Sequence, residues 1–169
     1  MEFKASFDTY AKVVITLVTI LFLGITAFFA QLMAQSDDPK TLLAPFILIL
    51  VINVGIYVVC YLYQPLKYVI SSGKVIVKRP IKDKIIALAD IKNVYATTPE
   101  SMGRVMKTFG NGGLFGFYGE FRSNRYGEMT WYATRKSNYV MLETSEGRIV
   151  ITPDDLQMVN EIKKLLVQE

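Results

Sequence analysis

Two long apolar runs near the start of the chain constrain its fold more than any other feature. They extend from Val13 to Ser36 and from Thr41 to Leu66, and neither contains a charged residue. A spanning helix needs about 20 apolar residues, because ~30 Å of hydrocarbon is crossed at ~1.5 Å per residue. The pattern predicts two transmembrane helices, at about 13–34 and 42–63. The short AQSDDPK segment between them predicts an antiparallel hairpin.

A cleaved signal peptide is the main alternative for the first run. Its apolar core exceeds the ~7–15 residues of a typical signal, and the small-residue cleavage pattern is poor. A buried soluble hairpin is disfavoured because neither run has a polar face. The amide of Asn53 lies near the middle of the second run, where we expect it to bond to Thr19 or Thr26. A transport path is disfavoured because the runs carry no charge.

The distribution of basic residues predicts the orientation of the hairpin. Lys4 and Lys12 precede the first run, Lys40 alone lies in the loop, and six basic residues follow the second run by residue 84. Because Lys and Arg accumulate on the cytoplasmic side, both termini should be cytoplasmic. We therefore expect a multi-pass protein of the inner, cytoplasmic membrane, with a transmembrane hairpin at 1–64 and a cytoplasmic domain at 65–169.

The composition excludes several classes of function. The chain has no histidine and one cysteine, Cys60, which lies inside the second run. This removes disulfides within the chain, cysteine metal sites, serine–histidine triads and the usual general base. We expect no catalytic residue, no metal and no cofactor, and thus a protein that is not an enzyme. The net charge of +4 is scattered among acidic residues without a recognition-helix or zinc pattern, so we expect no nucleic-acid partner.

The remaining hundred or so residues read as short strands followed by one helix. Two hairpins are clear, LKYVI-SSG-KVIVKR and NYVMLET-SEG-RIVIT, each with β-forming residues around a glycine-containing turn. Thr152 is a good N-cap for the last helix, with Pro153 at its first position. The order predicts an α+β, mainly β, domain: a bent antiparallel sheet or barrel of about seven strands, closed by a C-terminal amphipathic helix.

A segment rich in glycine and aromatic residues, FGNGGLFGFYGEF, stands apart. It lacks the GK[ST] sequence and the strand–loop–helix frame of a phosphate-binding loop. One interpretation is a tight, bulged turn packed within the sheet, where glycine supplies positive φ. The other is an apolar loop that enters the bilayer or holds a partner. Its candidate residues are Phe109, Gly110, Gly112, Gly113, Leu114, Phe115, Gly116, Phe117, Tyr118 and Gly119.

This segment, together with TWYATRKSNYVMLET and EGRIVITPDDLQMVNEI, resembles bacterial pleckstrin-homology (PH)-like domain proteins. The likeness is to the small membrane-anchored type with an N-terminal helical hairpin, and it covers most of Met102 to Ile162. The resemblance implies a seven-stranded PH-like barrel with a C-terminal helix. It implies no settled activity.

Lipid-binding PH domains carry basic residues around their first hairpin, and the matching hairpin here is also basic. Its candidates for a lipid headgroup are Lys74, Lys78, Arg79, Lys82 and Lys84. Positive charge that merely flanks a membrane span explains the same residues. The adjacent Lys78 and Arg79 also depart from the usual alternating basic pattern.

The leading functional hypothesis is a non-enzymatic, membrane-anchored module that mediates protein–protein interaction or assembly at the inner face of the membrane. An exposed sheet edge could accept a strand from a protein partner or from another copy of the chain. The alternatives are a domain that binds lipid headgroups, including anionic lipid, and an accessory subunit of a membrane enzyme or transporter.

Overall fold

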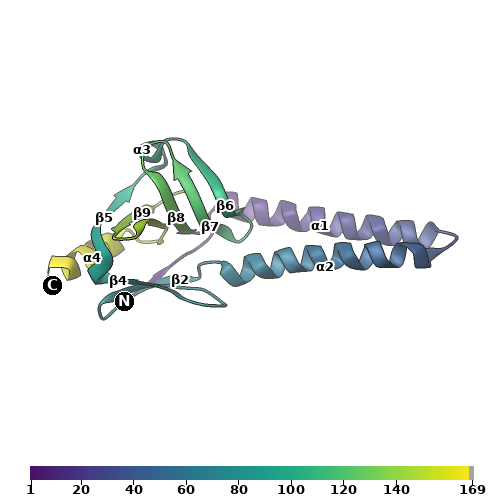
Figure 1. Ribbon diagram of the computed structural model, residues 1–169, viewed down its shortest axis with the longest axis horizontal. Coiled ribbons are helices and arrows are strands. Elements are labelled where there is room, and N and C mark those ends of the chain that lie inside the picture. Colours follow the sequence, from purple (N-terminus) through teal and green to yellow (C-terminus); the bar gives the residue numbers. More distant parts are fainter. Residues whose placement is uncertain (168–169) are drawn as a thin grey trace.

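The computed structural model describes residues 1–167 and confirms that both apolar runs are helical. Helix α1 extends over Thr9–Gln35 and α2 over Pro39–Tyr63, and each is long and apolar enough to cross a membrane. Figure 1 shows them side by side, projecting away from the β-strands, with the C-terminal helix at the opposite end of the molecule. The Asp8 side chain caps α1 by accepting from Ala11 N at 2.7 Å.

The hydrogen-bond partners of the polar residues within the two helices differ from those that the sequence predicts. The hydroxyl of Thr19 lies 2.9 Å from that of Tyr57 on α2, while Thr26 bonds to Phe22 O in its own helix. Nδ2 of Asn53 is buried and has no hydrogen-bond partner among residues 1–167. The predicted Asn53–threonine bond is therefore wrong, because Tyr57, one turn further along α2, reaches Thr19 instead.

The strands of the described residues form two sheets. The four-stranded sheet has the order β1 (Glu2–Lys4), β2 (Lys67–Ser71), β3 (Lys74–Lys78) and β4 (Lys84–Ala87). The six-stranded sheet has the order β5 (Ile91–Thr97), β9 (Tyr139–Thr144), β10 (Gly147–Ile151), β8 (Gly127–Ala133), β7 (Gly116–Ser123) and β6 (Val105–Gly113). A 3₁₀ turn, η1 (Leu88–Asp90), links the two sheets, and the short α3 (Pro99–Met102) precedes β6.

The fold class is confirmed, with two differences in detail. The sheets do not close into a barrel, and β10 pairs with β8 in parallel rather than antiparallel. The strand count exceeds seven partly because β1, which precedes the helices, pairs antiparallel with β2. The N-terminus thus contributes a strand to the domain that follows the hairpin. The division at residue 64 stays a prediction.

Two hydrophobic clusters fill the β-domain. One lies between the four-stranded sheet, strands β5, β9 and β10, and the C-terminal helix α4 (Gln157–Val167), whose Met158 and Ile162 are fully buried. The other lies on the opposite part of the six-stranded sheet, around Phe121, Trp131 and Met141. Burial of these apolar side chains is the main force that holds the domain together.

The segment before α1 is tied to the end of the domain by polar contacts. Asp154 accepts hydrogen bonds from the backbone N of Ser6 at 2.9 Å and from its hydroxyl at 2.5 Å, and forms an ion pair with Arg135. Partial burial raises the pKa of Asp154, but the bonds from Ser6 and the charges of Arg135 and Lys4 outweigh it. Its pKa therefore lies below the ordinary value.

The predicted cap of the last helix is wrong. Helix α4 begins at Gln157, whose N–H donates to the Asp155 side chain, and Thr152 lies outside the helix. The buried Thr152 hydroxyl instead accepts from the backbone N of Thr134 at 2.9 Å. The backbone N of Thr152 donates to the Tyr68 hydroxyl at 3.1 Å. The hydroxyl and the backbone N–H of Thr152 therefore form tertiary hydrogen bonds and do not cap the helix.

Candidate functional site

The glycine–aromatic hairpin, defined as residues 109–119 of β6, β7 and their turn, docks onto the two apolar helices. The Phe115 ring lies edge-on to Tyr57 and Tyr61 of α2, with ring centroids 4.9 and 5.8 Å apart. Tyr118 stacks on Tyr63 at 6.4 Å and donates its hydroxyl to Cys60 O at 2.9 Å. These contacts fix the domain against the end of α2.

The same hairpin also approaches α1. Phe117 stacks on Tyr10 with centroids 6.1 Å apart, and a Cβ on Gly113 would lie 3.0 Å from Val14 Cγ1. Glycine lets the strand come this close to the helix. The hairpin is thus a tight, bulged turn of the sheet, as one interpretation expected, and its aromatic residues pack on the chain's own helices; entry into the bilayer or contact with a partner stays a prediction.

Two glycines of the hairpin are required by backbone geometry. Gly116 has φ +115°, and a Cβ there would lie 2.6 Å from Ala133 O. Gly119 has φ +114°, and a Cβ there would lie 2.5 Å from Phe109 O. Both positions combine a left-handed backbone with close strand contact, so a side chain would displace a neighbouring strand.

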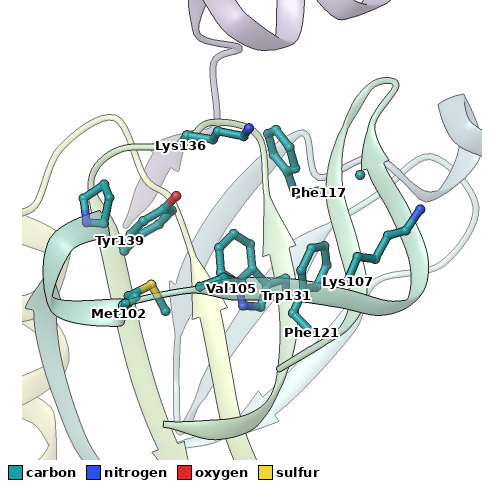
Figure 2. A pocket seen from close by; sticks show the side chains of 11 residues that line it. Met102, Val105, Lys107, Phe117, Phe121, Trp131, Lys136 and Tyr139 are labelled. Atoms are coloured by element: carbon teal, nitrogen blue, oxygen red, sulfur yellow. The ribbon is translucent and has the colours of Figure 1, made fainter. Parts of the chain in front are cut away.

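An aromatic pocket of about 390 Å³ lies beside this hairpin, between α3 and strands β6, β7 and β8. Figure 2 shows Phe117, Phe121 and Trp131 along it, with Met102 and Tyr139 at one side. This volume falls within the range of small-molecule sites in proteins, which are mostly apolar with a few polar groups. The pocket therefore has the size and lining of a ligand site.

Four polar groups belong to this aromatic pocket. Trp131 is 4% exposed, and its Nε1 has no hydrogen-bond partner within residues 1–167. Lys107 and Lys136 line the pocket and form no ion pair with a carboxylate of that range. Burial, and then the charges of Asp8 and Glu100, raise the pKa of Tyr139 to about 12, so its hydroxyl stays protonated at neutral pH.

One side of the aromatic pocket lies beside the start of α1. Nζ of Lys136 lies 3.5 Å from the centroid of the Tyr10 ring and 5.4 Å from that of Phe117. The backbone N of Lys136 donates to the Asp8 side chain at 2.8 Å, so the β8–β9 loop is attached to the helix cap. A ligand in the pocket would therefore lie next to the end of the apolar helix.

The five predicted headgroup residues are spread over both ends of the four-stranded sheet. Lys78 pairs with Asp83 at 2.5 Å, and Lys74 lies at the other end of β3, opposite Ala87. Arg79 donates Nε to Lys82 O at 2.7 Å. Their role in headgroup binding stays a prediction, but two of them already have partners within the chain.

Arg79 connects the β3–β4 turn to α2. Its guanidinium carbon lies 5.6 Å from the Tyr63 ring centroid and 5.5 Å from that of Tyr132. In the same turn, Ile81 N donates to Leu62 O at 3.2 Å. The basic turn therefore meets the end of α2 as well, beside the position where the glycine–aromatic hairpin docks.

Strand β6 forms a free edge of the six-stranded sheet within the described part of the chain. Its Met106 and Phe109 side chains are 63% and 78% exposed, which is unusual for large apolar residues on an edge strand. Lys107 lies opposite Phe121 on the pocket side, whereas Met106 lies opposite the exposed Arg122. Strand β6 thus carries Lys107 on the face of the pocket and the exposed Met106 on the opposite face.

Sequence reasoning found the glycine–aromatic hairpin but missed the aromatic pocket. Trp131 and Ala133 alternate on β8 with the half-exposed Thr130 and Tyr132, a signal for one buried face. Lys136 and Tyr10 carry no comparable signal, because they meet only through the packing of a loop against α1.

Comparisons with known proteins place the domain in a family. No curated protein and no solved structure matches the chain. A family model described as a bacterial PH domain matches residues 66–166, which include β2 to β10 and almost all of α4. PH-like domains are generally non-enzymatic. Since the match covers more than half of the chain, this protein belongs to the bacterial PH domain family.

Proposed function

We propose that the protein is a non-enzymatic, membrane-anchored module that binds a protein partner through strand β6. The observation that carries this proposal is the exposure of Met106 and Phe109 on a free sheet edge. An extended peptide can add to such an edge through backbone hydrogen bonds, while exposed side chains give selectivity. The partner is an extended segment of another protein at the same membrane.

The docked hairpin supports this role. Phe115 and Tyr118 hold the β6–β7 end of the sheet on α2, so the β6 edge keeps a defined position relative to the helices. A partner in the same membrane would meet this edge at a raised local concentration, since both molecules are confined to one surface. Anchoring and strand addition thus act together.

We further propose that both termini are cytoplasmic and that the membrane is the inner one. The basic residues on the domain side support this orientation, because Lys and Arg are retained on the cytoplasmic side. Fusion of a reporter that fluoresces only in the cytoplasm to the C-terminus tests it. A dark fusion, with a reporter active only outside the cytoplasm giving signal, would overturn the orientation.

Site-specific photo-crosslinking in cells tests the interaction. A photoreactive amino acid replaces Phe109 in the full-length protein, and the matched control places it at Ile85, which is 55% exposed on the free edge β4. We expect a discrete protein adduct from position 109 that Met106→Asp abolishes. No adduct, or the same adducts from position 85, would refute strand addition at β6.

A further inference from the structure

We propose that the aromatic pocket binds an anionic lipid from the membrane leaflet that faces the domain. Part of the hydrocarbon lies against the aromatic rings, and the acidic headgroup lies at Lys107 and Lys136. This site differs from the basic β2–β4 region and from the β6 edge. It goes beyond strand addition and requires only that the two helices anchor the chain in a bilayer.

The lining of the pocket suits the apolar part of such a ligand. Phe117, Phe121 and Trp131 contribute ring surface, and Met102 and Val105 contribute aliphatic surface. Phe121 and Trp131 stack with centroids 4.6 Å apart, which gives the pocket a continuous aromatic wall. Hydrocarbon gains by leaving water for such a wall, in proportion to the apolar area buried.

The polar groups suit an acidic headgroup. Lys107 and Lys136 carry positive charge without a carboxylate partner in residues 1–167, whereas Lys78 of the four-stranded sheet is already paired with Asp83. Tyr139 lines the same pocket and its protonated hydroxyl is a hydrogen-bond donor, while Nε1 of Trp131 is a buried donor without a partner in residues 1–167. All of these groups favour an oxygen anion, and none of the four is negatively charged.

The position of the pocket favours a lipid over a ligand from solution. Lys136 and Phe117 both contact Tyr10, in the first turn of the apolar helix α1. Tyrosine at the end of a spanning helix marks the level of the lipid headgroups. Figure 2 shows Lys136 and Phe117 on the side of the pocket nearest α1. A lipid beside α1 can therefore enter the pocket without crossing bulk water.

The chain supplies its own probe, because Trp131 is its single tryptophan and lines the pocket. The full-length protein is placed in liposomes of phosphatidylcholine with increasing fractions of phosphatidylglycerol whose acyl chains carry bromine. Bromine quenches tryptophan fluorescence on contact. We expect saturable quenching by brominated phosphatidylglycerol and little quenching by brominated phosphatidylcholine. Equal quenching by the two lipids, or none by either, would overturn the proposal.

Charge variants assign the effect to this pocket. Lys107→Gln and Lys136→Gln should each weaken the apparent affinity for the anionic lipid about fivefold, as expected for one basic residue at an anionic surface. Lys136→Arg should restore binding. The matched control is Lys92→Gln, an exposed lysine on β5 at the other edge of the sheet. An equal loss in the control would show nonspecific attraction and refute the site.

A pocket-filling variant tests the space in the pocket without changing charge. The three atoms nearest a Cβ on Gly112 all belong to the Lys107 side chain, with Cδ at 3.4 Å and Nζ at 3.7 Å, so Gly112→Leu adds bulk at the pocket wall beside Lys107. We expect it to abolish quenching by the anionic lipid while leaving crosslinking from position 109 intact. Unchanged quenching would mean that the lipid contacts Trp131 by another route, contrary to the proposal.

Discussion

Two turns of the β-domain meet the end of helix α2, and they do so with opposite chemistry. The β3–β4 turn is charged, and its Lys78 is neutralised by Asp83 in the same turn. The glycine–aromatic hairpin is apolar, and its Phe115 and Tyr118 find their partners on α2. The charged turn thus pairs Lys78 internally and contacts α2 through Arg79 and Ile81, whereas the apolar turn contacts α2 through two aromatic rings. Burial of aromatic rings, more than the charge near the membrane, should hold the domain in place.

The largest effect is expected for Gly116→Val, which disturbs the backbone of the apolar glycine–aromatic hairpin. The new Cβ would press on Ala133 O, and valine is strained at φ +115°. We expect a loss of more than about 3 kcal/mol of stability, in the class of severe backbone and packing defects. Thermal unfolding of the full-length protein in detergent measures it.

The control for this variant is Gly73→Asn, at a β2–β3 turn with φ +70° and open space around it. Asparagine tolerates the left-handed region, so its cost should be small. If Gly116→Val and Gly73→Asn unfold at the same temperature, the close strand contact at Gly116 does not contribute to stability.

A second prediction asks whether a carboxylate contributes more when it joins segments that are distant in sequence, as Asp154 joins Ser6 and Arg135. Asp154→Asn weakens the bonds to Ser6 and Arg135 and should cost about 2 kcal/mol, as for hydrogen bonds to a charged group. Because the folded pKa of Asp154 lies below its ordinary value of 3.8, its charge stabilises the fold above that pH. This stabilisation is lost as the pH falls through the folded pKa.

Unfolding by urea at a series of pH values checks this sign. The difference between wild type and Asp154→Asn should be constant from about pH 7 to pH 5 and shrink below about pH 4. A difference that grows on acidification would contradict the assigned direction of the pKa.

The third prediction removes the docking ring itself. Phe115→Ala deletes the edge-on contacts to Tyr57 and Tyr61, at an expected cost of about 1–2 kcal/mol for two aromatic pairs. Hydrogen exchange should show faster exchange in the β6–β7 turn, with α4 unchanged. Phe109→Ala is the control because that ring is 78% exposed. Equal exchange in both variants would mean that the ring contacts do not hold the domain.

The smallest effect is expected for the charged β3–β4 turn. Lys78→Gln removes the ion pair with Asp83, in which both side chains are about a third exposed, and such pairs contribute roughly 0–1 kcal/mol. Thermal unfolding should shift by less than for Phe115→Ala. A larger shift would reverse the comparison between the two turns.

Much of the fold was predictable because its signals are local. Helices α1 and α2 follow from uninterrupted apolar runs, and the β2–β3 and β9–β10 hairpins follow from glycine turns between β-forming residues. The aromatic pocket was not predictable. It brings together Lys107 of β6, Trp131 of β8 and Lys136 of the β8–β9 loop, with Tyr10 of α1 against Lys136, and these residues carry no shared periodicity.

The sequence by itself determined the two apolar helices, the β2–β3 and β9–β10 hairpins and the glycine turn at residues 109–119, because each rests on hydrophobicity or backbone freedom within a few residues. Only the tertiary structure decided that Phe115 packs on the chain's own helices, that β8 and β10 run parallel, and that Thr152 bonds to Thr134 rather than capping α4. The physical reason is the same in each case. Buried rings and polar groups take the partners that the whole chain places within reach, and that placement is not written in any local pattern.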